Sequence, residues 1–124
     1  MKQPNDKDME TLSRTEFEKS QKAMKELERQ AESMLADYNS GKTDAVTTRE
    51  LLHSLLDKAF SLDVYGADAE TEKYGHTQLD EQFTAAVGDP KKYGHLTSPK
   101  SSGSIARMFG PYDGSYEDYL YYVE

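Results

Sequence analysis

The sequence lacks cysteine altogether and is poor in β-branched aliphatic residues, with one isoleucine and four valines. The absence of cysteine excludes disulfide scaffolds, thiol nucleophiles and zinc–thiolate sites. The shortage of isoleucine and valine disfavours strands and predicts a mainly α-helical fold. No apolar run is long enough to span a membrane, and the polar first residues are unlike a signal peptide, so we expect a cytoplasmic protein.

Acidic residues outnumber basic ones, 23 to 15, which gives a net charge of −8. This balance argues against direct binding to a phosphate backbone and favours a basic partner protein. Leu, Ile, Val and Phe together make up only about a sixth of the 124 residues, which is low for a single domain. We therefore expect a thin core, partly completed by the nine tyrosines and five methionines or by oligomerisation.

The first half of the chain predicts a long helix over about 14–39. Ser13 and Glu16 have the spacing of a capping box, and Gly41 is placed to end the helix. Residues 1–12, before this cap, are expected to form a disordered leader.

Apolar residues in this helix alternate at spacings of three and four, as in a heptad seam, with Ser20 filling the one polar position of the pattern. Two interpretations remain open. The seam is either the core face of an intramolecular bundle or the contact of a homodimer or partner helix. Its members are Phe17, Met24, Leu27, Ala31, Met34 and Tyr38.

A second capping box, Thr47 with Glu50, predicts a helix over about 48–62, with Val46 and Leu51 as a hydrophobic staple. The connection to the first helix is short, so the two helices are expected to form an antiparallel hairpin. This second helix is the strongest predicted core segment of the chain. Its wide apolar stripe consists of Leu51, Leu52, Leu55, Leu56, Ala59, Phe60 and Leu62.

The tetrapeptide Lys-Tyr-Gly-His occurs twice, at Lys73–His76 and Lys92–His95. We interpret both copies as helix stops, because glycine tolerates the left-handed conformation that ends a helix. Short helices packed on the hairpin would then complete a helical domain over 13–97. Thr77 with Asp80 would start a new helix that ends at Gly88. Asp89 and Pro90 would start the next one.

The only histidines are His53, His76 and His95. His53 with Asp57, and His76 with Asp80, have the i, i+4 spacing that can place two metal ligands on one helix face. This spacing is common, and His76 is expected to lie just outside its helix. No recognised catalytic motif accompanies these residues, so the prediction is a protein that is not an enzyme and has no metal or cofactor. A small metal-dependent enzyme, using the three histidines with Asp57, Asp80 or Glu81, is kept as an alternative.

A stretch of linker composition, 98–104, precedes an acidic, Tyr-rich segment at 105–124. Tyrosine is enriched at protein interfaces, although these rings would equally suit closure over a poor core. Whether the segment is helical or extended is left open. The predicted partner-binding residues are Tyr112, Asp113, Tyr116, Glu117, Asp118, Tyr119, Tyr121, Tyr122 and Glu124.

Taken together, these features predict a non-enzymatic protein-binding regulator or inhibitor that docks its acidic, Tyr-rich surface on a basic partner. A second hypothesis is an inhibitor that imitates nucleic acid and occupies the channel of a nucleic-acid-handling complex. A third is a structural homodimer built through the long helix.

Overall fold

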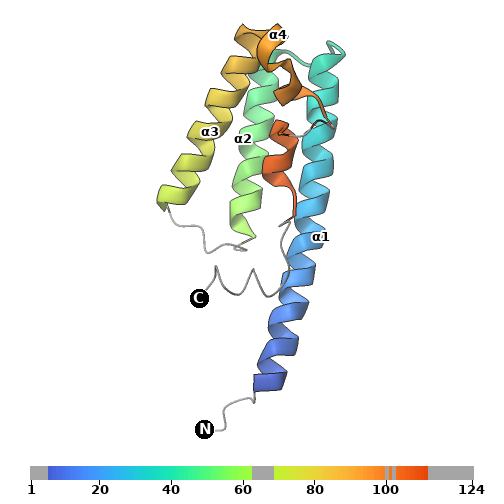
Figure 1. Ribbon diagram of the computed structural model, residues 1–124, viewed down its shortest axis with the longest axis vertical. Helices are drawn as coiled ribbons and strands as arrows, with labels where there is room; N and C mark the ends of the chain where they lie inside the picture. Colours follow the sequence, from blue (N-terminus) through green and yellow to red (C-terminus); the bar gives the residue numbers. More distant parts are fainter. Residues whose placement is uncertain (1–5, 63–68, 100, 102, 112–124) are drawn as a thin grey trace.

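The computed structural model describes residues 6–62, 69–99, 101 and 103–111, and side chains from Arg14 onward. Three long helices dominate the chain: α1 (Asp6–Asn39), α2 (Ala45–Ser61) and α3 (Ala69–Gly88). A single helical turn, α4 (Pro90–Tyr93), and two 3₁₀ turns, η1 (Gly94–Thr97) and η2 (Ile105–Phe109), follow them (Figure 1). The described ranges contain no strand, and the predicted mainly helical fold class is confirmed.

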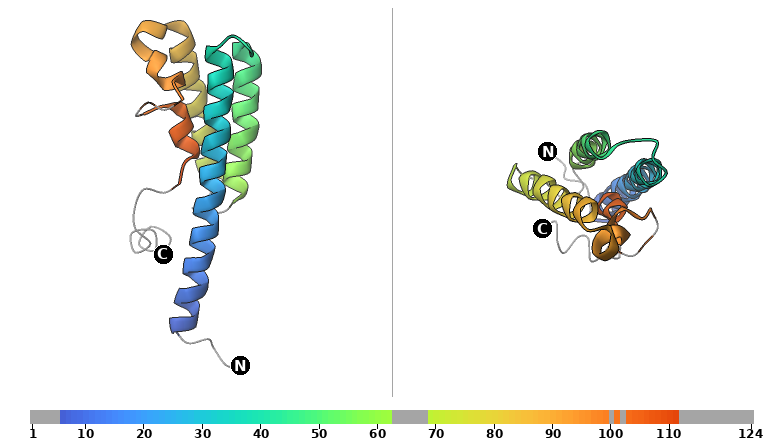
Figure 2. Two further views of the ribbon diagram at one scale, coloured as in Figure 1. Left: turned by 90° about the vertical axis from the view of Figure 1, so that its right-hand side faces the viewer. Right: turned by 90° about the horizontal axis from the view of Figure 1, so that it is seen from above.

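The three long helices pack side by side, with α2 in contact with both α1 and α3 (Figure 1). The turn η2 contacts α1 and α3, and lies between them when the molecule is seen from above (Figure 2). The N-terminal part of α1 extends well beyond the lower ends of α2 and α3 (Figure 1). Its 34 residues correspond to a rod of roughly 50 Å.

One hydrophobic cluster joins all three long helices and η2. Leu27, Ala31 and Leu35 of α1 are buried, which places this part of the predicted seam in the core of the chain itself. Leu35 was not among the predicted seam residues, although it follows Ala31 by one helical turn. Each large side chain in this core contributes roughly 1.5–3 kcal/mol by its burial. The other buried members are Leu52, Leu55, Leu56, Leu79, Phe83, Ile105, Ala106 and Phe109.

The outer ends of the predicted seam are less buried. Met24 is in the buried set, whereas Met34 and Tyr38 are partly buried against the cluster and Phe17 is half-buried. The ring of Tyr38 packs on Phe83 of α3, with centroids 5.5 Å apart.

Both predicted helix starts differ from the structure. Helix α1 begins at Asp6, inside the predicted leader, and passes through Ser13, because no glycine or proline interrupts the chain between these residues. Helix α2 is capped by Asp44, whose carboxylate accepts a hydrogen bond from the Thr47 amide at 2.7 Å. The predicted cap at Thr47 is therefore wrong, and the supposed staple of Val46 and Leu51 is 62% and 42% exposed.

The first Lys-Tyr-Gly-His copy is not a helix stop, because α3 runs unbroken through it. Gly75 is buried in the helix interior, where a Cβ atom would lie 2.7 Å from Cζ of Phe60. The glycine therefore serves the close approach of α2 and α3 and not a left-handed turn. It follows that the cap predicted at Thr77 does not exist.

The second copy does end a helix. Asp89 caps α4 by accepting a hydrogen bond from the Lys92 amide at 3.3 Å, and Pro90 occupies the first helical position. The α-helical turn ends before Gly94, where the chain continues as the 3₁₀ turn η1. The left-handed conformation predicted for this glycine is wrong, because Gly94 has a φ of −59° and a ψ of −24°. Gly41, with a φ of 81°, ends α1 as predicted, and α3 ends at Gly88.

The helical body does not stop at residue 97. Ile105 and Phe109 of η2 are fully buried, and the buried Ser104 hydroxyl caps this turn by accepting from the Ala106 amide at 3.1 Å. The start of the predicted C-terminal segment is thus part of the core. The protein is poor in aliphatic residues, and its only isoleucine, Ile105, is one of the buried residues of this cluster.

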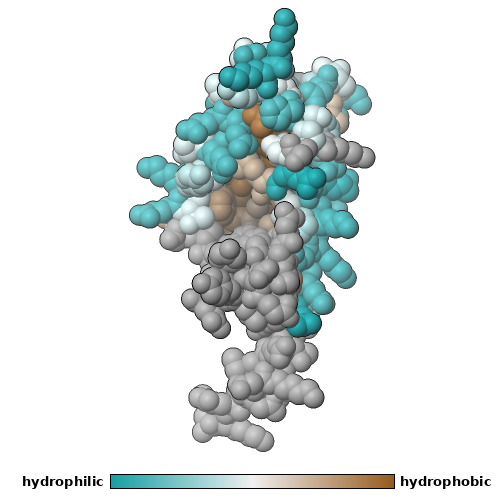
Figure 3. All heavy atoms as spheres, in the orientation of Figure 1, coloured by the Kyte–Doolittle hydropathy of each residue, from teal (hydrophilic) through white to brown (hydrophobic). Residues whose placement is uncertain are grey.

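Hydrophilic side chains cover most of the coloured part of the face seen in Figure 3, and hydrophobic residues show only in a narrow central strip. Within the described ranges, no helix combines the length and the apolar character needed to cross a bilayer.

Candidate functional site

Two histidines from neighbouring helices contact each other directly. The Nδ1 atoms of His53 on α2 and His76 on α3 lie 2.7 Å apart, and their ring centroids are separated by 4.8 Å. His76 lies inside α3, so its predicted position outside a helix is wrong. Its neighbour Gly75 has no side chain to hold the two helices apart.

The second nitrogen of each ring contacts an aspartate of the opposite helix. His53 Nε2 lies 2.7 Å from Asp80 Oδ1, and His76 Nε2 lies 2.8 Å from Asp57 Oδ1. The two i, i+4 pairs predicted from the sequence therefore meet, but the contacts cross between helices. We call the series Asp57–His76–His53–Asp80 the histidine–aspartate chain.

The two rings are more buried than the carboxylates. The side chains of His53 and His76 are 24% and 28% exposed, compared with 45% for Asp80 and 59% for Asp57. Phe60 stacks on His76 with an angle of 16° between the ring planes and centroids 6.4 Å apart. At the Asp80 end of the series, Arg49 Nε lies 4.0 Å from Asp80 Oδ1. The histidine–aspartate chain thus has a sheltered centre and solvent-accessible ends.

The main chemical feature of the histidine–aspartate chain is the number of hydrogens that its three contacts require. Each of the three contacts needs one hydrogen between two atoms that otherwise present lone pairs. Two neutral imidazoles supply only two N–H groups, and ionised carboxylates supply none. With both rings neutral, one contact would bring two lone pairs together. The arrangement therefore calls for one additional cation, which is either a third proton or a metal ion.

A third carboxylate lies beside one end of the chain. Glu72 precedes His76 by one turn of α3, and ligand atoms of Asp57, Glu72 and His76 all lie within 4.8 Å of one another. Sequence reasoning missed Glu72, because the expected helix stop at Gly75 separated it from His76. Its i, i+4 spacing from His76 was the available signal.

The remaining predicted metal-site residues are not part of this cluster. His95 is on η1, which adjoins α4 beyond the C-terminal end of α3, and His76 lies in the N-terminal half of that helix. Ala86 of α3 lines the same hollow as Gly94 and Thr97 of η1. His76 lies ten residues before Ala86, which corresponds to about 15 Å along the axis of α3. Glu81 is an exposed residue outside the cluster.

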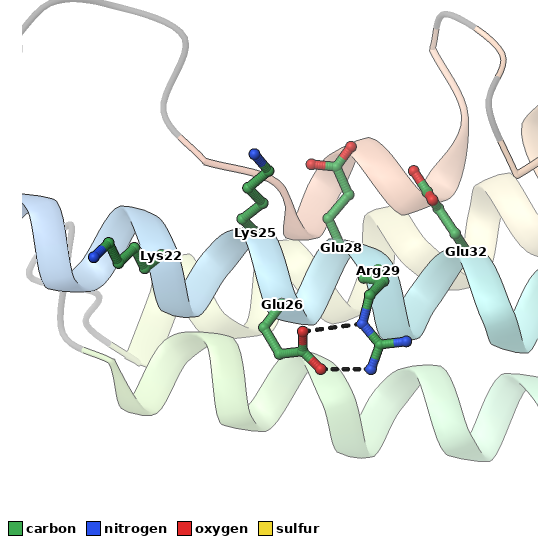
Figure 4. Close-up of a pocket in the computed structure, with 6 residues that line it drawn as sticks. All are labelled: Lys22, Lys25, Glu26, Glu28, Arg29 and Glu32. Atoms are coloured by element: carbon green, nitrogen blue, oxygen red, sulfur yellow. Dashed lines mark hydrogen bonds and ion pairs between the residues drawn. The ribbon is translucent and has the colours of Figure 1, made fainter.

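The outer face of α1 carries both signs of charge and has a surface hollow of about 420 Å³ (Figure 4). Glu26 and Arg29 pair there through two contacts, of 2.9 and 2.6 Å. The hydrogen bonds that Arg29 donates to Glu26 lower the pKa of the Glu26 carboxyl and raise the pKa of the Arg29 guanidinium. Lys25, Glu28 and Glu32 point to the opposite side (Figure 4). Such a mixed face is typical of a solvated helix surface.

A smaller apolar groove of about 340 Å³ lies between the start of α2 and the end of α3. The exposed side chains of Val46 and Val87 line it, together with Phe83 and Arg49.

The predicted partner-binding residues from Tyr112 to Glu124 lie outside the described ranges. Comparison of the chain with models of protein families, with curated proteins and with solved structures found no match.

Proposed function

We propose that this protein is a non-enzymatic regulator that binds a basic partner protein through the acidic, Tyr-rich segment 112–124. The segment contains five tyrosines and four carboxylate side chains, with no lysine or arginine. Tyrosine supplies contact area at low entropic cost, and the carboxylates would steer a basic surface toward it.

The supporting structural observation is the burial of Phe109. This side chain is fully buried against the helical bundle, three residues before the segment begins. Ile105 adds a second buried contact in the same turn. The point from which the segment leaves is therefore fixed to a rigid body, which lowers the entropic cost of presenting it to a partner.

The charge pattern of α1 favours this proposal over imitation of nucleic acid. Basic and glutamate side chains are mixed along its outer face, whereas a nucleic-acid mimic needs a continuous acidic surface. Partner binding by a short acidic segment needs no such surface on the bundle.

Affinity capture from the native cell lysate tests the proposal with three baits. These are the full chain, a chain that ends at Pro111, and a full chain in which Asp113, Glu117, Asp118 and Glu124 are replaced by their amides. We expect the full chain to retain a basic protein that both variants lose. Raising the salt concentration from about 0.05 to about 0.5 M should also release it, because screening weakens such contacts.

Ending the chain at Pro111 keeps Ile105 and Phe109, so loss of binding by this variant is not loss of the fold. A matched control replaces four exposed glutamates of the bundle, Glu16, Glu18, Glu50 and Glu81, by glutamine. This control has the same net charge as the amide variant and should still bind. Capture of the same protein by all four baits would refute the proposal.

A further inference from the structure

We propose that Asp57, Glu72 and His76 form a binding site for a divalent transition-metal ion, with Zn²⁺ as its best occupant. The ion would be bound by Nε2 of His76 and by one oxygen of each carboxylate. Imidazole and carboxylate are both ordinary zinc ligands, and three protein ligands leave a coordination position for water. The proposal is independent of the proposed partner binding.

A metal ion at this position supplies the cation that the histidine–aspartate chain lacks. Nε2 of His76 would direct its lone pair to the metal, so Nδ1 of that ring carries the hydrogen and donates to Nδ1 of His53. The Nε2–H group of His53 then donates to Asp80. Each contact is satisfied by two neutral rings, and no third proton is needed.

The distances allow an ion to enter with small movements. Ligand atoms about 2.1 Å from a tetrahedral zinc ion lie about 3.4 Å from one another. The contact between His76 and Asp57 is 2.8 Å, and the widest separation among the three ligand atoms is within 4.8 Å. One pair must open by about half an ångström while the carboxylate of Glu72, on an exposed side chain, moves closer.

The residues behind His76 have the arrangement that holds metal-binding histidines in other proteins. Such histidines almost always donate their second N–H group to a fixed acceptor, which sets the tautomer and the ring orientation. Here the acceptor is His53, and Asp80 fixes the tautomer of His53 in turn. Phe60 lies nearly parallel to the His76 ring, with the ring centroids 6.4 Å apart.

Solvent can reach the metal position, because Asp57 and Glu72 are both exposed. The choice of a transition metal over Mg²⁺ rests on the imidazole ligand, since Mg²⁺ prefers oxygen ligands in octahedral geometry.

Calorimetric titration of Zn²⁺ into the full chain, prepared without a histidine tag and freed of metal by a chelator, tests the site. We expect one ion bound per chain. Glu72→Gln should weaken zinc binding by at least about tenfold. A loss of about tenfold in affinity is the lower end of the range even for residues that only hydrogen-bond to a metal ligand. Glu70→Gln, which neutralises another exposed residue in the first turn of the same helix, should leave the affinity unchanged.

Glu72 separates the two possible cations, because it belongs to the metal site but not to the histidine–aspartate chain. His53→Gln removes the imidazole that accepts the hydrogen bond from His76. It should weaken zinc binding by about 10- to 100-fold, with the helical circular dichroism retained. Absence of stoichiometric zinc, or equal affinities for the parent chain and Glu72→Gln, would overturn the proposal and leave a third proton as the cation.

Discussion

Gly75 of α3 lies so close to Phe60 of α2 that a Cβ atom at position 75 would be only 2.7 Å from the Phe60 ring. This contact explains why α3 contains a glycine in its interior, where glycine costs about 1 kcal/mol relative to alanine. The same approach of the two helices brings His53 and His76 within 2.7 Å. Helix packing and the geometry of the candidate site therefore depend on one missing side chain.

Replacing Gly75 by alanine should destabilise the protein despite the better helix propensity of alanine. Overpacking against Phe60 costs about 1–3 kcal/mol, and the propensity gain offsets about 1 kcal/mol of it. Urea denaturation should show a free energy of unfolding lower by about 1 kcal/mol. Gly88→Ala is the matched control, since no described atom lies within 4 Å of its Cβ position. A stability gain at both glycines would contradict the packing role of Gly75.

Phe109→Ala should cost about 3–5 kcal/mol of unfolding free energy, because it leaves a cavity where a fully buried ring joins η2 to the bundle. That is a large share of the roughly 5–15 kcal/mol that stabilises a typical domain. Chemical denaturation followed by circular dichroism measures it. A chain ending at Ser104 should be similarly impaired, whereas one ending at Pro111 should fold. Equal stability of these two truncated chains would refute the anchoring role of η2.

Asp44→Ala should lower the melting temperature by removing the N-terminal cap of α2. The hydrogen bond from the Thr47 amide lowers the pKa of Asp44 in the folded state. A lowered pKa means that the cap contributes fully above the ordinary carboxyl pKa and is lost as pH falls through the folded-state value. The difference in melting temperature between the parent chain and Asp44→Ala should shrink in acid.

Asp44→Asn is the control for this prediction, because asparagine can cap the helix without an ionisable group. The difference between Asp44→Asn and Asp44→Ala should stay nearly constant over the same pH range. A parent-to-alanine difference that grows in acid would contradict the assigned role of the carboxylate.

His53 and His76 should be energetically coupled. A double-mutant cycle with alanine at each position should give a coupling energy of at least about 0.5 kcal/mol, the lower end of the range for residues in contact. The cycle is measured by urea denaturation in the presence of a chelator, so that metal binding does not contribute. His95→Ala paired with His53→Ala serves as the control, and the effects of these two changes should add. Additive effects for His53 and His76 would show that their contact contributes nothing.

Much of the helical architecture could be predicted from local sequence patterns. The apolar spacing from Met24 to Tyr38 and the leucines of α2 identified the part of the core that α1 and α2 supply, with the exception of Leu35. Gly41 identified the end of α1, and Asp89 identified the start of α4. Helix starts were less predictable, because Asp44 and Thr47 are both good caps and the choice between them depends on packing.

The candidate site could be predicted only in part, because its contacts run between helices. The i, i+4 pairs marked the four members of the histidine–aspartate chain, but the crossed pairing requires the register of α2 against α3. Gly75 misled the prediction, since glycine that ends a helix and glycine that permits close packing look alike in sequence. The burial of Ile105 and Phe109 was missed because a linker-like stretch precedes them.

The central structural claim is that α2 and α3 build a site that lacks one cation, and a crystal structure grown with Zn²⁺ tests it most directly. Anomalous scattering at the zinc edge should locate one ion within about 2.0–2.2 Å of His76 Nε2 and of the Asp57 and Glu72 carboxylates. His53 should remain in contact with both His76 and Asp80. A zinc ion bound only elsewhere, such as at His95, or an unoccupied Asp57–Glu72–His76 site at saturating zinc, would contradict the claim.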